Sequence, residues 1–163
     1  MSRKIIIASI GLAVILVVGV IGCGKVNTVA TLSSGTATLA GNDYGFDFSE
    51  NKIFLTPDEN YDLMLLTMLD KDLEVKMSIF INSEKGGRIR DLGEKELDSI
   101  SIVSTEGYGT LEVYVFPMLN HAYAVRTAEQ NFAKIYVTSI LTEESGYQIS
   151  FDWVYQPDGS GNF

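Results

Sequence analysis

Large apolar side chains occupy every second position of the segment 149–155, where they alternate with a serine, an aspartate and a valine. Successive side chains of a β-strand point to opposite faces of a sheet, so this spacing predicts a strand with one buried face. An aromatic stripe of period two is typical of the core face of a sheet rather than of a ligand platform. The predicted core positions are Ile149, Phe151, Trp153 and Tyr155.

Similar alternation recurs along the chain between short turns. Strands are expected near residues 44–48, 53–55, 61–69, 75–81, 111–115, 123–127, 132–141 and 147–155. The last three should pair as successive antiparallel neighbours, because only short segments join them. The segment 61–69 suits a strand or a helix, and we assign it to a strand because 75–81 alternates after an intervening turn. One helical turn is expected within 94–98. The pattern predicts an all-β fold, either a single antiparallel sandwich or a partly closed barrel.

The amino-terminal residues carry a different pattern. Arg3 and Lys4 precede an apolar run from Ile5 to Ile21, and Gly22 and Cys23 follow it. This is the charged start, apolar middle and small-residue exit of a secretory signal. The four residues from 20 to 23, VIGC, resemble a bacterial lipobox. The resemblance implies that residues 1–22 are a signal peptide and that Cys23 becomes a lipidated first residue. Two or more acyl chains such as palmitate hold a protein stably on a bilayer.

Two other interpretations of this run stay open. An uncleaved transmembrane helix needs about 20 apolar residues, slightly more than residues 5–21 offer. The second interpretation is an ordinary secretory signal that is followed by an incidental cysteine. We favour the lipid anchor because Cys23 stands where the lipid chemistry requires it, and the sequence holds no second cysteine for a disulfide. Gly24 follows in place of aspartate, which resembles the pattern for sorting to an outer membrane, if the source has one.

Charge and length constrain the chain beyond the signal. Removing residues 1–22 leaves 141 residues, enough for one domain with a real core. The whole chain has 12 cations, 21 anions and a net charge of −9, and loss of Arg3 and Lys4 lowers it to −11. Such a surface repels phosphate backbones and anionic headgroups, so nucleic acid is not expected as a partner.

The segment after the lipobox is rich in Thr, Ser, Ala and Gly. We expect residues 23–43 to form the lipidated cysteine and a flexible tether, and residues 44–163 to form the β domain. In the alternative, Thr28–Leu32 pair as an edge strand.

No pattern identifies a catalytic site. His121 is the only histidine, and no Gly-x-Ser-x-Gly elbow accompanies it for nucleophilic catalysis. A zinc site is not expected, because carboxylates would have to supply nearly the whole ligand shell. Arg88 and Arg90 follow two glycines and are candidates for binding an anion, although a plain hairpin loop also explains them.

Several segments resemble, in order, the elements of haem-uptake lipoproteins of Bacteroidetes. They are Phe46–Ile53, Tyr61–Leu63, Asn82–Gly87, Tyr123–Thr127 and Phe132–Ile135. The resemblance spans most of residues 44–141 and implies an all-β domain that holds haem through His or Met side chains. In this chain His121, with Met118 or another methionine, would take that role, since a second histidine is absent from the sequence.

The sequence favours an envelope-anchored, non-catalytic β domain that binds a small ligand or a protein partner outside the cytoplasm, held to the membrane by its lipid. The first alternative is uptake of haem or a porphyrin through His121 and Met118; no other cofactor is expected. Arg88 and Arg90 are further candidates for ligand binding. The second alternative is a hydrolase that uses paired carboxylates.

Overall fold

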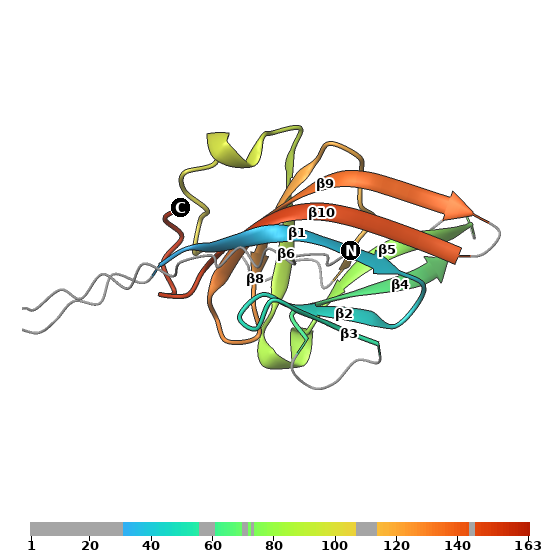
Figure 1. The fold of residues 1–163 in the computed structure, drawn as a ribbon, viewed down its shortest axis with the longest axis horizontal. Coiled ribbons are helices and arrows are strands. Elements are labelled where there is room, and N and C mark those ends of the chain that lie inside the picture. The colour runs from blue at the N-terminus through green and yellow to red at the C-terminus, as the bar shows by residue number, and fades with distance from the viewer. Residues whose placement is uncertain (1–30, 56–60, 70–71, 73, 107–113, 144–145) are drawn as a thin grey trace, which may run out of the picture.

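The computed structural model describes residues 31–55, 61–69, 72, 74–106, 114–143 and 146–163. Within these ranges the chain forms ten strands and two short 3₁₀ helices. The strands build two five-stranded antiparallel sheets that pack face to face, and Figure 1 shows them as two layers. The all-β prediction is confirmed. Of its two forms the sandwich is correct, because the sheets do not close into a barrel.

Sheet A has the strand order β1-β10-β9-β8-β6. Its strands are β1 (Ser33–Ala40), β6 (Arg88–Gly93), β8 (Ala122–Arg126), β9 (Phe132–Glu143) and β10 (Gly146–Gln156). Sheet B has the order β3-β2-β4-β5-β7. Its strands are β2 (Tyr44–Asp47), β3 (Lys52–Phe54), β4 (Leu63–Leu69), β5 (Val75–Ile81) and β7 (Tyr114–Val115). As predicted, β8, β9 and β10 pair as successive antiparallel neighbours, and 61–69 supplies a strand.

The expected tether is wrong for its second half. Residues 33–40 form β1, which pairs with β10 from Ser33 opposite Tyr155 to Ala40 opposite Gln148. Two of its side chains, those of Ala37 and Leu39, are buried in the core. Small residues alternating with Thr and Ser are typical of a linker, but they also suit an edge strand, which needs few buried side chains. The alternative of an edge strand is correct in kind for Ser33–Ala40; of the predicted segment Thr28–Leu32, only residues 31 and 32 are described, and they precede β1. Residues 23–30 lie outside the described ranges.

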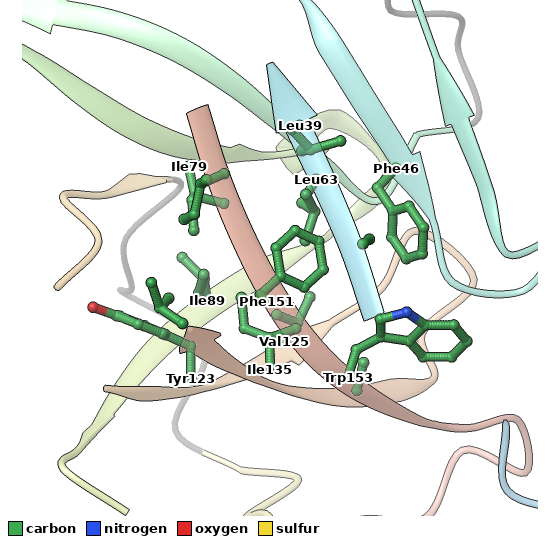
Figure 2. Close-up of a cluster of buried hydrophobic side chains, with 14 of the residues drawn as sticks. Leu39, Phe46, Leu63, Ile79, Ile89, Tyr123, Val125, Ile135, Phe151 and Trp153 are labelled. Carbon is green, nitrogen blue, oxygen red and sulfur yellow. The ribbon is translucent and has the colours of Figure 1, made fainter. Parts of the chain in front are cut away.

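The main core lies between the two sheets. The predicted stripe of β10 faces it, with no member more than 4% exposed. Aromatic rings from both sheets meet there at angles near a right angle (Figure 2): the centroid of the Phe46 ring is 5.1 Å from that of Phe48 and 5.7 Å from that of Phe151. Such pairs add about 0.5–1.5 kcal/mol each beyond the burial of their area. The aromatic residues of β2 and β10 therefore hold the layers together.

A smaller layer covers the outer face of sheet A. The helical turn expected within 94–98 is shifted along the chain, to the 3₁₀ helix η2 (Leu97–Ser99), and the second 3₁₀ helix is η1 (Ser83–Lys85). Lys134 of β9 is buried beneath η2 and donates hydrogen bonds to the carbonyl oxygens of Leu97 and Ile100, at 2.8 and 2.7 Å. Burial lowers the pKa of Lys134, and Asp98 nearby opposes that shift. Two carbonyl dipoles thus compensate a buried cation.

A buried carboxyl links the two sheets just before β4 begins. Asp62 accepts the N–H of Phe48, beside sheet B, and the N–H of Ala128, in the β8–β9 turn of sheet A, both at 2.9 Å. Burial raises the pKa of Asp62 to about 7, and the two N–H donors act in the opposite direction. The carboxyl therefore joins the layers at one end of the sandwich and changes charge near neutral pH.

Stability should fall as the pH rises from about 4 to 7. The unfolded chain releases the Asp62 proton near its ordinary pKa of 3.8, whereas the folded chain keeps it until about 7. The folded state binds more protons across this interval, so the free energy of unfolding decreases with pH. Urea unfolding of the wild type and of Asp62→Asn at several pH values measures this. The wild type should lose stability relative to the variant as the pH rises; a relative gain would contradict the account.

Candidate functional site

A pocket of about 340 Å³ opens at the edge of the sandwich where β6 and β7 come together. Its lining residues are Asp91, Tyr114, Val115, Phe116 and Tyr123. β6 and β7 are the terminal strands of their sheets, so no further strand of the described chain covers this edge. The pocket is continuous with the core, because Val115 and Tyr123 belong to the buried cluster. It offers a mostly aromatic wall to a ligand.

His121 adjoins this pocket and is held by Asp91. The Nδ1 atom of His121 lies 3.1 and 3.0 Å from the two carboxylate oxygens of Asp91. Because a carboxylate accepts hydrogen bonds, the neutral ring carries its proton on Nδ1 and its lone pair on Nε2. No residue in the described part of the chain hydrogen-bonds Nε2. The arrangement leaves one imidazole nitrogen in the form that binds metals.

A β-bulge aims the carboxylate of Asp91. The pairing of β6 with β8 shifts register between Asp91 and Gly93, and Gly93 adopts a φ of 80°. The N–H of Gly93 donates to Asp91 Oδ1 at 2.7 Å. Bulges re-aim side chains next to functional sites, and glycine permits a positive φ without steric cost. The bulge therefore holds the Asp91 carboxylate in place, and that carboxylate in turn orients the His121 ring.

The turn from Met118 to His121 is held at both ends. The N–H of His121 donates to the carbonyl oxygen of Met118 at 3.3 Å, and the N–H of Met118 donates to the Tyr123 hydroxyl at 2.8 Å. Asn120, with a φ of 62°, donates its N–H to the carbonyl oxygen of Val137. The two predicted ligand-binding residues, His121 and Met118, thus stand at the ends of one ordered turn.

Tyr123 connects this turn to the core. Its ring is fully buried, and Figure 2 shows it at the opposite end of the core cluster from Trp153, with its hydroxyl directed away from the other labelled side chains. Burial raises the pKa of Tyr123 to about 12; the Met118 N–H opposes this shift and Asp91 adds to it. The phenol therefore stays protonated near neutral pH and serves as a fixed acceptor.

Exposed apolar side chains follow the pocket residue Phe116 along the chain. Phe116, Met118 and Leu119 are 36%, 47% and 51% exposed. The ring of Phe116 meets that of Tyr114 edge to face, with 5.7 Å between centroids. An exposed group of large apolar residues beside a pocket marks a binding surface.

Two other hollows lie on the outer face of sheet A, with volumes of about 490 and 430 Å³. They share Glu96 and Tyr136. Asp98 and Asp152 line the first, and Glu94 the second. The first is also lined by the apolar residues Leu97, Trp153 and Val154, and the second by Lys95. The smaller pocket at the sandwich edge is the better candidate for an aromatic ligand.

The structure does not bring the two candidate arginines to this pocket. Arg88 and Arg90 alternate along β6 with Ile89, which is buried in the core, and with Asp91, so they lie on the other face of sheet A. Arg88 donates to the carbonyl oxygen of Gly87, and the N–H of Gly87 is itself bonded to Asn82. Anion binding by these residues stays a prediction, as does lipidation of Cys23, which lies outside the described residues.

The buried carboxyl groups of the described residues are held by hydrogen bonds. The two buried aspartates, Asp47 and Asp62, accept hydrogen bonds from local backbone and hydroxyl groups. Across the described ranges, His, Asp and Glu do not gather in groups of three that could hold a metal ion. In the same ranges no helix has the length and hydrophobicity to cross a membrane.

No protein-family model and no curated protein sequence matches this chain. Its fold is similar to that in the crystal structure of an apo HmuY analog from Tannerella forsythia, with a TM-score of 0.52 and 14% identity. The similarity covers 81% of this chain and 100% of the other. At this identity it shows a shared fold, that of a two-sheet β-sandwich. The similarity does not identify a ligand for the edge pocket of this chain.

Replacing Tyr123 by phenylalanine should loosen the Met118–His121 turn and leave the core intact. The variant keeps the buried ring but removes the acceptor for the Met118 N–H, which costs about 1 kcal/mol. Amide hydrogen exchange by NMR should then show faster exchange at Met118. Tyr155→Phe is the matched control, since its hydroxyl accepts from Asn131 elsewhere. Unchanged protection of Met118 in Tyr123→Phe would contradict this role.

Proposed function

We propose that this protein binds haem, or a closely related tetrapyrrole, and serves in its uptake outside the cytoplasm. The observation that carries the proposal is the imidazole of His121, oriented by Asp91 beside an aromatic pocket at the uncovered edge of the sandwich. The sequence resemblance to haem-uptake lipoproteins and the fold shared with an HmuY analog support the same conclusion.

The residues of the edge pocket fit such a ligand. Haem requires a donor for its iron and apolar surface for its ring, and histidine is a common iron ligand. His121, which contacts the lining residue Asp91 but is not itself in the pocket wall, would supply the donor, and Tyr114 and Phe116 would supply aromatic surface. A volume of about 340 Å³ lies within the usual range for ligand pockets. When bound, the group would supply a Lewis-acidic iron, and this chain would bind and orient it without a catalytic step.

The proposal makes the general expectation of a non-catalytic binding domain more specific. The alternative of a hydrolase with paired carboxylates gains no support, because the buried Asp47 and Asp62 are engaged with nearby backbone groups. We place the protein in the cell envelope on the strength of its amino-terminal pattern, with Cys23 as the point of lipid attachment.

Titration of the protein with haemin tests the ligand. The wild type should give a saturable shift of the Soret band, and His121→Ala should weaken binding at least about tenfold, since the iron ligand contributes more than about 1.4 kcal/mol. Glu50→Ala, an exposed change in the β2–β3 turn, is the control and should bind like the wild type. Absence of a saturable shift in the wild type would refute the proposal, and equal binding by His121→Ala would refute the site.

The anchor has a separate test in a bacterial host. The wild type should partition with membranes and have the mass of a chain that lacks residues 1–22 and carries acyl groups. Cys23→Ala should lose both the acyl mass and the membrane association, because two or more chains are needed for stable attachment. A wild-type chain that is itself full-length and stays in the membrane regardless of Cys23 would show a spanning helix instead.

A further inference from the structure

The rim of the sandwich that carries β1 and β3 lies on the side away from the edge pocket, and it leaves both backbone groups and apolar side chains uncovered. We infer that this rim joins two copies of the chain, with β1 of one copy paired antiparallel to β1 of the other and Ala37 at the two-fold axis. The two A sheets then continue as one sheet. This interface is separate from the proposed ligand site and does not depend on it.

β1 and β3 end the two layers at the same place. The rings of Phe46, on β2, and Phe151, on β10, lie 5.7 Å apart across the core, so β2 faces β10. β3 is the next strand beyond β2, and β1 is the next beyond β10 (Figure 1). Neither layer has a further strand of the described chain there. A neighbouring copy can therefore extend both layers together.

The outer edge of β1 offers a row of backbone hydrogen-bonding groups. Gly41 donates its N–H to the carbonyl oxygen of Tyr147, one step beyond the last register pair of β1 with β10. Antiparallel partners alternate between bonded and non-bonded pairs, so the odd-numbered residues of β1 bond to β10 and the even-numbered ones point away. The register is unbroken over the whole strand. The residues whose N–H and C=O groups face the open edge are Ser34, Thr36, Thr38 and Ala40.

The sequence of β1 does not protect this edge. Natural sheets block exposed edges with charged side chains, proline or bulges, because an open edge is a template for another strand. The eight residues of β1, SSGTATLA, include neither a charge nor a proline. The terminal strand β6, in contrast, carries Arg88, Arg90 and Asp91 and has a bulge. Among the long terminal strands described, β1 is the one left ready for pairing.

Apolar side chains of β3 lack a cover at the same rim. Ile53 lies opposite Phe46 in the register of β2 and β3, so its side chain points to the interior between the layers. It is nevertheless 44% exposed, and Leu55, two residues further on, is 69% exposed. The inward-facing residues Gly35 and Ala37 of β1 are too small to add much cover. The rim is therefore open and apolar.

A second copy is the partner that this rim fits. The chain has a net charge of −9, so two copies repel each other over much of their surface. The rim avoids that repulsion, because β1 is uncharged and Lys52 of β3 pairs with Glu50 at 3.8 Å. A two-fold axis perpendicular to the sheet keeps both inner faces on one side, so β3 meets β3 of the partner. Ile53 and Leu55 of each copy then cover one another.

The register follows from the fullest overlap of the four outward residues. It places Ser34 opposite the partner's Ala40 and Thr36 opposite the partner's Thr38, and each such pair exchanges two backbone hydrogen bonds. On the inner face, the two-fold axis passes between the two copies of Ala37. Gly35 faces the partner's Leu39, so the smallest residue of the strand lies opposite the largest.

Disulfide formation in the full-length chain tests the pairing and its register. Ala37 faces the partner's Ala37 as a non-hydrogen-bonded pair, whose Cα atoms lie about 4.5 Å apart, within disulfide range. Ala37→Cys, made in a bacterial host and oxidised in its membranes with copper phenanthroline, should therefore run as a covalent dimer on non-reducing gels. Thr36→Cys and Thr38→Cys are the matched controls, because each lies about 7–8 Å from its own equivalent and should link poorly. The wild type shows any linkage through Cys23.

Thr38→Pro separates backbone pairing from other contacts. The Thr38 N–H points away from β10, so proline removes no bond within one copy but two across the interface. Sedimentation of the full-length chain in detergent should show a dimer whose Kd rises at least about tenfold in this variant. Thr38→Val loses the same hydroxyl, which bonds Ser150, but keeps the N–H. It should stay within about threefold of the wild type.

Ile53→Ser tests the apolar part of the rim. The dimer should weaken at least about threefold, because Ile53 is buried only in the pair. Leu141→Ser, on β9, is the control, since Leu141 is also 44% exposed but lies elsewhere. Circular dichroism of each variant checks folding.

Two outcomes would overturn the inference. A wild type that stays monomeric at every concentration would leave this edge to a strand of a different protein. A dimer in which Ala37→Cys does not link and Thr38→Pro has no effect would place the contact elsewhere. Haemin titration is a separate measurement, so failure of the proposed function and failure of this interface are distinguishable.

Discussion

The described structure of this molecule depends on the packing between the inner faces of its two sheets. Neither a disulfide nor a long helix contributes to the described structure, so burial between the layers supplies most of the driving force. Phe46 of β2 and Phe48, which directly follows that strand, meet aromatic rings of β10 at one end of the sandwich, those of Phe151, Trp153 and Tyr155. Tyr123 and Ile89 continue the same core toward the other end. The position of β8 results from this packing.

The candidate site is built outward from that core. Tyr123 buries its ring in the core and uses its hydroxyl to hold the turn that carries His121. Asp91 comes from the neighbouring strand and is aimed by a bulge at the open edge. At the edge of a sheet, strand pairing ends, so the backbone can depart from regular strand geometry without disrupting the core. A sandwich can therefore keep its layers unchanged while one edge is shaped for binding.

The sequence predicted the layers better than the site. Period-two spacing in β10 identified the core face because alternation is a local property of the strand. β1 was missed because an edge strand buries few side chains, and its Thr and Ser resemble a linker. β6 was missed because arginines alternate there with Ile89 and Asp91. His121 was found by its rarity, whereas Asp91 lies 30 residues away and meets it only through the pairing of β6 with β8.

Mapping ferric haemin on the protein by NMR tests the central claim most directly, because the paramagnetic iron broadens nearby amide signals. The account predicts selective broadening around residues 89–93 and 114–123, at the edge formed by β6, β7 and the turn before β8. Signals of β1 and β3, which form the opposite edges of the two sheets, should persist. Broadening centred instead on the acidic hollows near residues 94–98 and 152–154 would contradict the account, as would uniform broadening without a preferred site.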